Sequence, residues 1–507
     1  LPLAAAAIIL LLQTGLGAGM ALLEATPTVK ALHLGMALLA LGSLLTAVMA
    51  AFRQPGETVR LHQIAKVRFN RLTVLTTAST FVLLLSGALV TAADAGAACP
   101  GWPLCGSLLP SNSTAWLAFG HRLITLAASV LITYQFLRAW REQRSQPVQL
   151  SAATGAMILL LGQVMVGALK VERGFPADLV GLHAASAAAL WGVQVVLIAS
   201  AWFSGRTSGE EEEECLQPLP RFGLRMRDFL MLNKPIIVLL LLVTTYAGMV
   251  VGAKQLPGLG LTVWTMLGGA LAAGGSSALN QYIDRELDKR MQRTAKRPLP
   301  AGRLTPAEGL AYGLGACLLA FFLMAGFVNL LAALLSLAGM IYYVLLYSIW
   351  LKHATVQNIV IGGGAGAIPP LVGWAAATGS LNIPSMFLFA LVFLWTPAHF
   401  WALALVREKD YARGGVPMLP VVRGEQETRK QIFIYTLELV ALTLLMPVFK
   451  VTGSIFLISA VVLGLWLLHS AYRVLRNGGN KNAHLMYRYS SMYLAFIFLA
   501  MVIDALA

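Results

Sequence analysis

Three polar residues, Asn280, Asp284 and Asp288, are spaced four positions apart in the segment NQYIDRELDKR at 280–290. On a helix each step of four residues drifts by only about 40°, so the three side chains share one face. Two carboxylates one turn apart repel each other unless a cation lies between them. Hard oxygen ligands at a membrane surface suit Mg²⁺, which commonly bridges to the phosphates of a substrate. The spacing therefore predicts a magnesium site for a phosphorylated substrate.

Basic residues surround this acidic face, as binding of a polyanion requires. They are Arg285, Lys289, Arg290, Arg293, Lys296 and Arg297. A plainer interpretation is the charged end of a membrane helix, held by ion pairs between residues four apart. The aspartate spacing alone leaves both interpretations open.

A second acidic and basic stretch, REKDYARGGVPMLPVVRG at 407–424, supports the first interpretation. It also follows an apolar segment, and it brings Asp410 to the same side of the membrane as Asp284. The basic residues beside it are Arg407, Lys409 and Arg413. Two such stretches facing one cavity favour a diphosphate held through Mg²⁺. The chemistry would be loss of that diphosphate from a lipid-like allylic substrate.

Membrane-spanning helices must position these side chains. Of the 507 residues, 58% are hydrophobic and 12% are charged, and the mean hydropathy is +0.74. Apolar runs of roughly 18 residues or more recur, which excludes a soluble protein and predicts an all-α polytopic membrane protein. About fifteen spans are expected, near 3–22, 30–51, 72–93, 115–137, 152–170, 180–203, 235–253, 262–282, 307–327, 329–350, 355–376, 384–405, 431–449, 453–472 and 486–506.

The net charge of +15 does not indicate nucleic-acid binding, because the basic residues lie in short loops between apolar runs. This is the positive-inside pattern of a prokaryotic cytoplasmic membrane protein, with anionic lipid and anionic substrates as partners. The loops 284–306, 406–430 and 473–488 are expected inside, and the loop 94–113, without Lys or Arg, outside. The chain opens LPLAAAA, which we interpret as a partial start rather than a signal peptide.

A change in composition divides the chain. Residues 204–232 contain Gly, Pro, a run of glutamates and then a basic stretch. We interpret 205–232 as a cytoplasmic linker between a six-span unit at 1–204 and a nine-span unit at 233–507, with the glutamates as a solvated spacer.

The second unit resembles the intramembrane prenyltransferases, and within them the haem O synthase (protohaem farnesyltransferase) branch. The matching segments are NKP at 233–235, NQYIDRELD at 280–288, RTAKRPLPAGRLTP at 293–306, IGGGAGAIPPLVGW at 361–374, WTPAHFWALAL at 395–405 and DYARGGVPMLPVV at 410–422. The wider superfamily usually has a second Asp where this chain has Gly414, which differs from quinone-type relatives and suits the haem branch. The resemblance implies that Asn280, Asp284 and Asp288 form the first metal–diphosphate site and that Asp410 belongs to the second.

The resemblance also implies a reaction. Farnesyl diphosphate ionises, its C1 cation is captured by a vinyl group of haem b, and water completes the hydroxyethylfarnesyl chain of haem O. Mg²⁺ is the implied cofactor, with Asp284, Asp288 and Asp410 as its ligands. The implied diphosphate-binding residues are Arg285, Lys289, Arg293, Lys296, Arg297, Arg407, Lys409 and Tyr411.

Several residues of this unit keep two interpretations. His399, in TPAHFW, either ligates or orients the haem acceptor or is a satisfied core histidine. Five aromatic residues either shield the carbocation from water or pack in the ordinary way; they are Tyr246, Tyr342, Tyr343, Tyr347 and Trp401. GGGAG at 362–366 is not a phosphate loop, because no GK[ST] follows, and such small residues favour close helix packing.

In the first unit, every second span carries a histidine: His33, His121 and His183. By the expected topology each lies a turn or two from the outer end of its span. Singly, each is best explained as a satisfied core histidine, but three at one depth favour bis-imidazole haem ligation. In the outer loop between two of these spans, Cys99 and Cys105 favour a disulfide over a metal site, since no His or further Cys is nearby.

These features resemble haem A synthase, which oxidises a methyl group of haem O to a formyl group. The resemblance rests on GALVTAADAGAACPGWPLC at 87–105 and GHR at 120–122. It implies that His121 and His183 hold a haem b cofactor and that His33 is one ligand of the substrate haem. The first two spans of that family, with a partner histidine and a glutamate important for the oxidation, have no counterpart here. The unit is therefore either a fragment or a haem-binding domain without full oxidase activity.

The leading hypothesis is a fused enzyme of haem O and haem A biosynthesis that serves cytochrome oxidase assembly, with oxidase assembly proteins as possible partners. One alternative is a prenyltransferase for a quinone-type or chlorophyll-type acceptor, against which Gly414 argues. Another is a haem carrier or transporter that uses the three histidines; it would leave Asp284, Asp288 and Asp410 without a role. The two expected sites face opposite sides of the membrane, so direct transfer of haem O between them does not follow.

Overall fold

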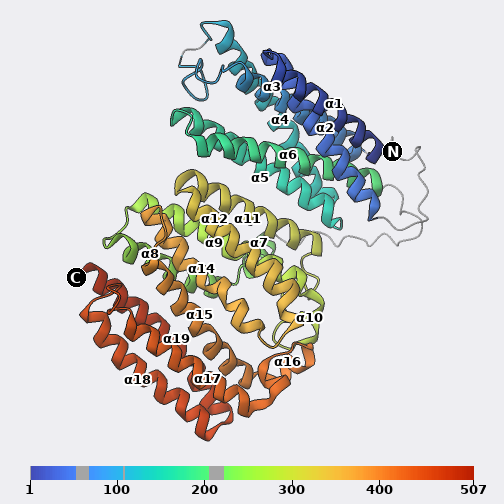
Figure 1. Cartoon of the computed structure of the whole chain (residues 1–507). Coiled ribbons are helices and arrows are strands. Elements are labelled where there is room, and N and C mark those ends of the chain that lie inside the picture. The colour runs from blue at the N-terminus through green and yellow to red at the C-terminus, as the bar shows by residue number, and fades with distance from the viewer. Residues whose placement is uncertain (1, 53–67, 107–108, 205–221) are drawn as a thin grey trace, which may run out of the picture. The chain divides into compact units, whose positions relative to one another are not determined.

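The computed structural model describes residues 2–52, 68–106, 109–204 and 222–507. Every regular element in these ranges is a helix (Figure 1), which confirms the expected all-α class. The chain divides into two compact units. The first comprises 1–220 with 305–318, and the second 221–304 with 319–507.

Fourteen helices of the described chain are long and apolar enough to cross a membrane. The fifteenth expected span, 431–449, falls on α17 (Leu419–Leu445). That helix is 27 residues long, but its first half contains the charged sequence RGEQETRK at 423–430, and it does not meet the same criterion of length and composition. The expected number of about fifteen spans is thus close to what the helices show.

The first unit consists of three consecutive helical hairpins, in which each helix packs against the next one along the chain. Their helices are α1 (Pro2–Leu22), α2 (Pro27–Ala51), α3 (Arg68–Ala92), α4 (Ser113–Glu142), α5 (Pro147–Glu172) and α6 (Ala177–Ser204). Local sequence marks their starts. Thr26 caps α2 and Asn112 caps α4 through side-chain oxygens, and Pro27 and Pro147 occupy first-turn positions that need no backbone donor.

The second unit begins with α7 (Phe222–Leu232), which occupies the last eleven residues of the expected linker. Residues 205–221, with the acidic run, lie outside the described residues. The remaining helices are α8 (Pro235–Ala253), α9 (Leu259–Ile283), α10 (Arg285–Arg290), α11 (Pro306–Phe327), α12 (Leu330–Ile341), η2 (Tyr342–Leu351), α13 (Lys352–Ala354), α14 (Asn358–Thr378), α15 (Ile383–Val406), α16 (Glu408–Gly414), α17, α18 (Ser454–Asn477) and α19 (Gly479–Leu506). Of α11, the residues up to 318 belong to the first unit.

The core of the second unit lies among its later helices. α15, α17, α18 and α19 pack together around large side chains that are almost fully buried, among them Trp401, Phe456, Tyr493 and Phe498. Trp401 packs edge-on against Tyr435 within this core. Its position agrees with the ordinary packing interpretation rather than with a cavity wall.

Ten residues at Tyr342–Leu351, η2, form a π-helix, a wider turn that accommodates an extra residue and is often found at functional sites. Glycines of α14 make room for its aromatic side chains. A Cβ atom at Gly362 would collide with the Tyr347 ring, and one at Gly364 would lie 2.9 Å from the Tyr342 hydroxyl. The GGGAG segment therefore serves close packing, as its small residues predict.

Candidate functional site

The acidic face keeps its register across a break in the helix. α9 ends at Ile283 and α10 begins at Arg285, with Asp284 between them. The backbone N–H of Asp284 donates to the carbonyl of Asn280 at 2.9 Å, and that of Asp288 donates to the carbonyl of Asp284 at 2.8 Å. These are α-helical hydrogen bonds, so Asn280, Asp284 and Asp288 follow one another on one face.

All three side chains of this acidic face are buried, with exposed fractions of 5%, 4% and 3% for Asn280, Asp284 and Asp288. The Asn280 Nδ2 donates to Asp284 Oδ2 at 2.8 Å and to Ser348 Oγ of the π-helix at 3.1 Å. Buried carboxylates require compensating charge, because removal from water strongly disfavours their ionised form.

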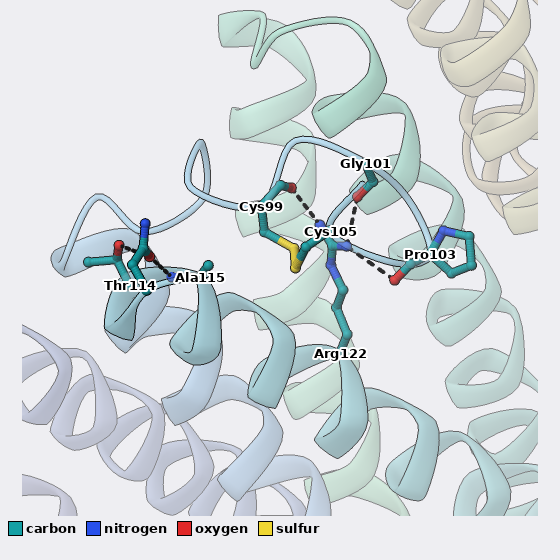
Figure 2. The surroundings of a disulfide bond; sticks show 8 residues. Cys99, Gly101, Pro103, Cys105, Thr114, Ala115 and Arg122 are labelled. Carbon is teal, nitrogen blue, oxygen red and sulfur yellow. Dashed lines mark hydrogen bonds between the residues drawn. A yellow bond between two sulfur atoms is a disulfide. The ribbon is translucent and has the colours of Figure 1, made fainter. Parts of the chain in front are cut away.

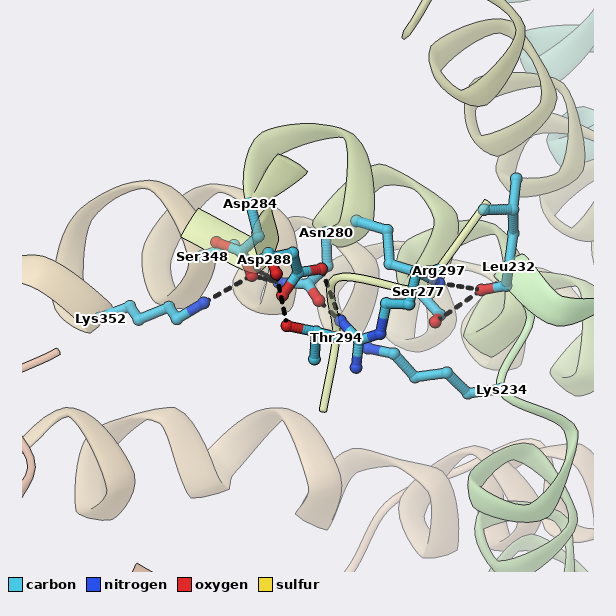
Figure 3. Close-up of polar contacts among 11 residues, drawn as sticks. Leu232, Lys234, Ser277, Asn280, Asp284, Asp288, Thr294, Arg297, Ser348 and Lys352 are labelled. Carbon is cyan, nitrogen blue, oxygen red and sulfur yellow. Dashed lines mark hydrogen bonds and ion pairs between the residues drawn. The ribbon is translucent and has the colours of Figure 1, made fainter. Parts of the chain in front are cut away.

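Three cations from three separate segments supply that charge (Figure 3). Lys352 Nζ lies 2.6 Å from Asp284 Oδ2, and Arg297 NH1 lies 2.7 Å from Asp288 Oδ2. Lys234 Nζ donates to Asn280 Oδ1 at 3.1 Å. Two carboxylates and an amide are thus enclosed by three cations.

Lys234 is held in place by the end of α7. The Leu232 carbonyl accepts hydrogen bonds from Ser277 Oγ at 2.8 Å and Gln281 Nε2 at 2.7 Å, which tie this turn to α9 (Figure 3). Burial, together with the nearby Arg297 cation, lowers the pKa of Lys234 to about 7, although the two aspartates oppose the shift. A bound anion would restore the charged form, so this lysine is suited to bind phosphate.

One oxygen of the acidic face remains available. Asp284 Oδ1 is buried and has no hydrogen-bond partner among the described residues. An unpaired buried carboxylate oxygen is costly unless a ligand completes it, and a hard divalent cation is such a ligand. Across the described chain, however, no group of three or more His, Cys, Asp and Glu side chains gathers closely enough to hold a metal ion. A Mg²⁺ ion here would depend on Asp284 and Asp288, with phosphate oxygens and water completing its shell.

Asp410 does not join this face directly. It is buried in α16, and its Oδ1 lies 3.1 Å from NH2 of Arg413. α16 nevertheless packs against α10, and a Cβ atom on Gly414 would lie 3.3 Å from the Met291 side chain. Gly414 stands at the position that differs from quinone-type relatives. Its small size therefore contributes to the close contact between the two acidic stretches.

The other basic residues predicted to bind diphosphate differ in their contacts and in their exposure. Arg285 donates to the Tyr282 carbonyl at 2.8 Å and lies over the Tyr282 ring, and Lys289 pairs with Glu286 at 3.0 Å. Neither set of contacts involves a residue of the acidic face. Four more are exposed, namely Arg293, Lys296, Arg407 and Lys409, whereas Tyr411 is partly buried. Of the basic residues predicted to bind diphosphate, only Arg297 contacts the acidic face.

Sequence reasoning missed Lys234, Ser348 and Lys352. Lys234 stands in the NKP match but received no role. Lys352 is a lone cation directly after an apolar span. A charged residue at that position is commonly a positive-inside residue, so the sequence offered no specific signal for its contact with Asp284.

His399 is enclosed by neighbouring rings. Its ring stacks on Trp395 at 4.2 Å between centroids and packs against Tyr487 at 4.6 Å, and its Nδ1 lies 2.9 Å from Ser490 Oγ. These contacts join α15 to α19. They describe a satisfied core histidine, and contact with a haem acceptor stays a prediction.

The three histidines of the first unit lie in the second or third turn of α2, α4 and α6. The Nδ1 atoms of His33 and His183 are buried and have no hydrogen-bond partner among the described residues. Lys170 of α5 lies close enough to both His121 and His183 to interact electrostatically with their rings. Imidazoles with unused nitrogen atoms and a nearby cation fit a haem, whose iron takes nitrogen ligands and whose propionates take a positive charge.

The loop before α4 contains a disulfide between Cys99 and Cys105 (Figure 2). Arg122, the residue after His121, reaches up into this loop. Its guanidinium donates to the carbonyls of Cys99 at 3.0 Å, Gly101 at 2.7 Å and Pro103 at 3.1 Å. The arginine of the GHR segment thus holds the disulfide loop against α4.

Comparison with known proteins identifies both units. The UbiA prenyltransferase family model matches residues 241–497, and a model described as cytochrome oxidase assembly protein matches residues 1–195. Protoheme IX farnesyltransferase of Roseiflexus sp. (strain RS-1) is 41% identical over 491 residues, which are 93% of this chain and 90% of the relative. Protoheme IX farnesyltransferase of Symbiobacterium thermophilum is 51% identical over 284 residues, 56% of this chain and 95% of the relative.

Among solved structures, a UbiA homolog from Archaeoglobus fulgidus bound to GPP and Mg²⁺ is 18% identical, with a TM-score of 0.42, and covers 54% of this chain and 99% of that chain. The family matches confirm the expected order of an oxidase assembly unit followed by a prenyltransferase unit. The chain is a prenyltransferase that belongs to the UbiA family, among the protoheme IX farnesyltransferases, and carries a cytochrome oxidase assembly domain before its prenyltransferase domain.

Proposed function

We propose that this chain transfers the farnesyl group of farnesyl diphosphate to a vinyl group of haem b, which gives haem O. The observation that carries the proposal is the acidic face, where Asp284 and Asp288 are buried among Lys234, Arg297 and Lys352. Such a site binds a diphosphate through its cations and a bridging Mg²⁺ through its carboxylates. The relatives named above supply the choice of substrates.

Mg²⁺ bound at Asp284 and Asp288 would neutralise the diphosphate and stabilise it as a leaving group. The residues of the chain do the rest. Lys234, Arg297 and Lys352 bind phosphate oxygens as the bond from C1 to oxygen breaks and the electron pair leaves with the diphosphate. The vinyl carbon of haem b then forms a bond to C1. Water adds to the cation left on the acceptor and loses a proton, which completes the hydroxyethylfarnesyl group.

Asp410 is proposed to act from the second acidic stretch. Its helix packs against α10, so Asp410 lies next to the acidic face without joining it. Together with the exposed Arg293 and Arg407 it would contact the diphosphate from the other side. Asp410 therefore completes the site only when substrate and Mg²⁺ are present.

The first unit is proposed to bind haem b through His121 and His183, with His33 as one ligand of a substrate haem. The buried Nδ1 atoms without partners and the nearby Lys170 support this proposal. Bis-imidazole ligation would give a low-spin haem suited to electron transfer in the oxidation of haem O. Formation of haem A would show that the unit also catalyses that oxidation.

We further propose a location in the cytoplasmic membrane, with the acidic face toward the cytoplasm and the three histidines toward the outside. The basic loops that flank the acidic face and the loop 94–113, without Lys or Arg, support this orientation. Proteins that assemble cytochrome oxidase are the proposed partners of the first unit.

The test uses membranes that contain the full chain, incubated with haem b, farnesyl diphosphate and Mg²⁺. Haems are separated by chromatography and identified by mass. Wild type is expected to form haem O, Asp284→Ala to form none, and Glu286→Gln, a change to the exposed carboxylate on α10, to behave as wild type. Haem A in addition would show an active oxidase unit. Prenylation of a quinone precursor but not of haem b by the folded protein would overturn the proposed acceptor.

A further inference from the structure

The three hairpins of the first unit repeat one contact. In each, a glycine on the first helix faces the histidine on the second, and the next residue after the glycine is alanine. A Cβ atom built on the glycine would lie 3.0 to 3.1 Å from Cε1 of the ring. The pairs are Gly17 with His33, Gly87 with His121, and Gly167 with His183. Each histidine ring therefore lies against bare helix backbone, at a place where a side chain would displace it.

The three contacts differ in the residue before the glycine. Leu16 and Val166 precede Gly17 and Gly167, and neither side chain can form a hydrogen bond. Ser86 precedes Gly87, and its Oγ lies 2.8 Å from Nδ1 of His121. The Nδ1 atoms of His33 and His183 have no partner within the described part of the chain. His121 is thus the histidine of the three whose ring is held by a hydrogen bond.

The direction of this hydrogen bond follows from the single hydrogen of the serine hydroxyl. Ser86 Oγ also lies 2.7 Å from the Leu83 carbonyl, which can only accept. The hydroxyl hydrogen therefore points to Leu83, and the Oγ lone pair accepts from Nδ1–H of His121. This arrangement fixes the neutral tautomer whose Nε2 carries the free lone pair, the form that binds iron.

We propose that Ser86 is a positioning residue for iron ligation by His121. The inference rests on the proposed haem-binding function of the first unit. Ser86 orients one ligand before haem arrives, whereas the Nδ1 atom of His183 has no hydrogen-bond partner among the described residues to do the same. His121 is accordingly the anchoring ligand, and the hydrogen bond from its Nδ1–H makes Nε2 a stronger donor to iron.

The test compares two variants of nearly equal volume in the full chain. Ser86→Thr keeps a hydroxyl that can contact both Leu83 and His121, and Ser86→Val removes it. Haem retention is measured as the rate of haem loss to excess apomyoglobin, together with the midpoint potential of the bound haem. Ser86→Val is expected to lose haem about 10-fold faster than Ser86→Thr, with a higher midpoint potential, because a weaker donor stabilises ferric iron less.

Ser129→Ala is the matched control, because Ser129 on α4 donates to the Thr125 carbonyl at 2.7 Å and, among the described residues, does not hydrogen-bond to a histidine. It is expected to match wild type in both measurements. Equal haem loss and equal potential in Ser86→Val and Ser86→Thr would overturn the role of Ser86 alone, provided that His121→Ala still abolishes bound haem. Full haem content in both His121→Ala and His183→Ala would overturn haem ligation itself, and the inference with it.

Discussion

Buried polar atoms differ in how they find partners at the acidic face of the second unit and in the histidine hairpins of the first unit. At the acidic face, most polar atoms already have partners within the chain, and three cations compensate two carboxylates. In the hairpins, the buried Nδ1 atoms of two of the three histidines have no hydrogen-bond partner in the part of the chain that the structure describes. The first arrangement suits the proposed transfer, whose substrate binds and leaves. The second suits the resident haem proposed for the first unit.

The contrast predicts that the two units depend on metal ions differently. Removal of divalent cations with EDTA should stop haem O formation, a loss of at least about 10³-fold, because the diphosphate loses its bridging charge. Added Mg²⁺ should restore the activity, and the haem spectrum of the first unit should stay unchanged throughout. Transfer at the full rate in EDTA would remove the basis for a metal role of Asp284 and Asp288.

The preorganised cations can be tested singly. Lys352→Ala should slow haem O formation by about 10²-fold, since one preorganised charge on the leaving group is lost. Lys289→Ala is the matched control, because Lys289 pairs with Glu286 on the exposed side of α10, and its rate should change by less than about two-fold. The measurement is the initial rate at saturating substrates, with thermal unfolding as a check of folding. Similar rates for the two variants would contradict the role of Lys352.

The glycine contacts of the hairpins offer a smaller effect. Gly87→Ala places a Cβ atom 3.0 Å from Cε1 of His121 and should displace the ring, so we expect roughly 5-fold faster haem loss. Gly120→Ala, next to His121 on the same helix, meets no atom within 4 Å and should have no effect. The rate of haem loss to excess apomyoglobin distinguishes the two variants. An equal effect of both substitutions would indicate a general disturbance of the α3–α4 hairpin rather than a specific contact.

The smallest expected effect concerns the disulfide loop. Arg122→Gln removes charged hydrogen bonds to three loop carbonyls and should lower the unfolding temperature of the first unit by about 3 °C. Arg141→Gln, at an exposed position near the end of the same helix, should leave it within about 1 °C. Differential scanning calorimetry of the purified chain measures these unfolding temperatures. An unchanged unfolding temperature for Arg122→Gln would show that the disulfide alone holds the loop.

Local rules were sufficient for much of the structure. Periodicity and apolar runs predicted the helices, and spacing of four predicted the shared face of Asn280, Asp284 and Asp288. Thr305 and Glu308 form a capping box of the kind that residues three apart allow, with hydrogen bonds from Thr305 N to Glu308 Oε2 and from Glu308 N to Thr305 Oγ1. Each of these features depends on residues within a few turns of each other.

What the sequence did not predict comes from distant segments. Lys234 and Lys352 are 46 and 68 residues away from their partners, Asn280 and Asp284, and only tertiary packing brings them together. Ser86 and His121 are 35 residues apart. The π-helix at Tyr342–Leu351 could not be predicted either, because its extra residue breaks the 3.6-residue period on which helix patterns depend.

The π-helix also makes the site sensitive to the local winding of the helix. Ser348 contacts Asn280 from within this segment, and Lys352 contacts Asp284 directly after it. Conversion of this segment to an ordinary α-helix without a change in its length would turn everything beyond it by about 100° for each extra residue that the π-helix absorbs. Both side chains would then leave the acidic face while every site residue remained chemically intact. In this enzyme a substitution that only rewinds the π-helix can therefore matter as much as a substitution at an aspartate.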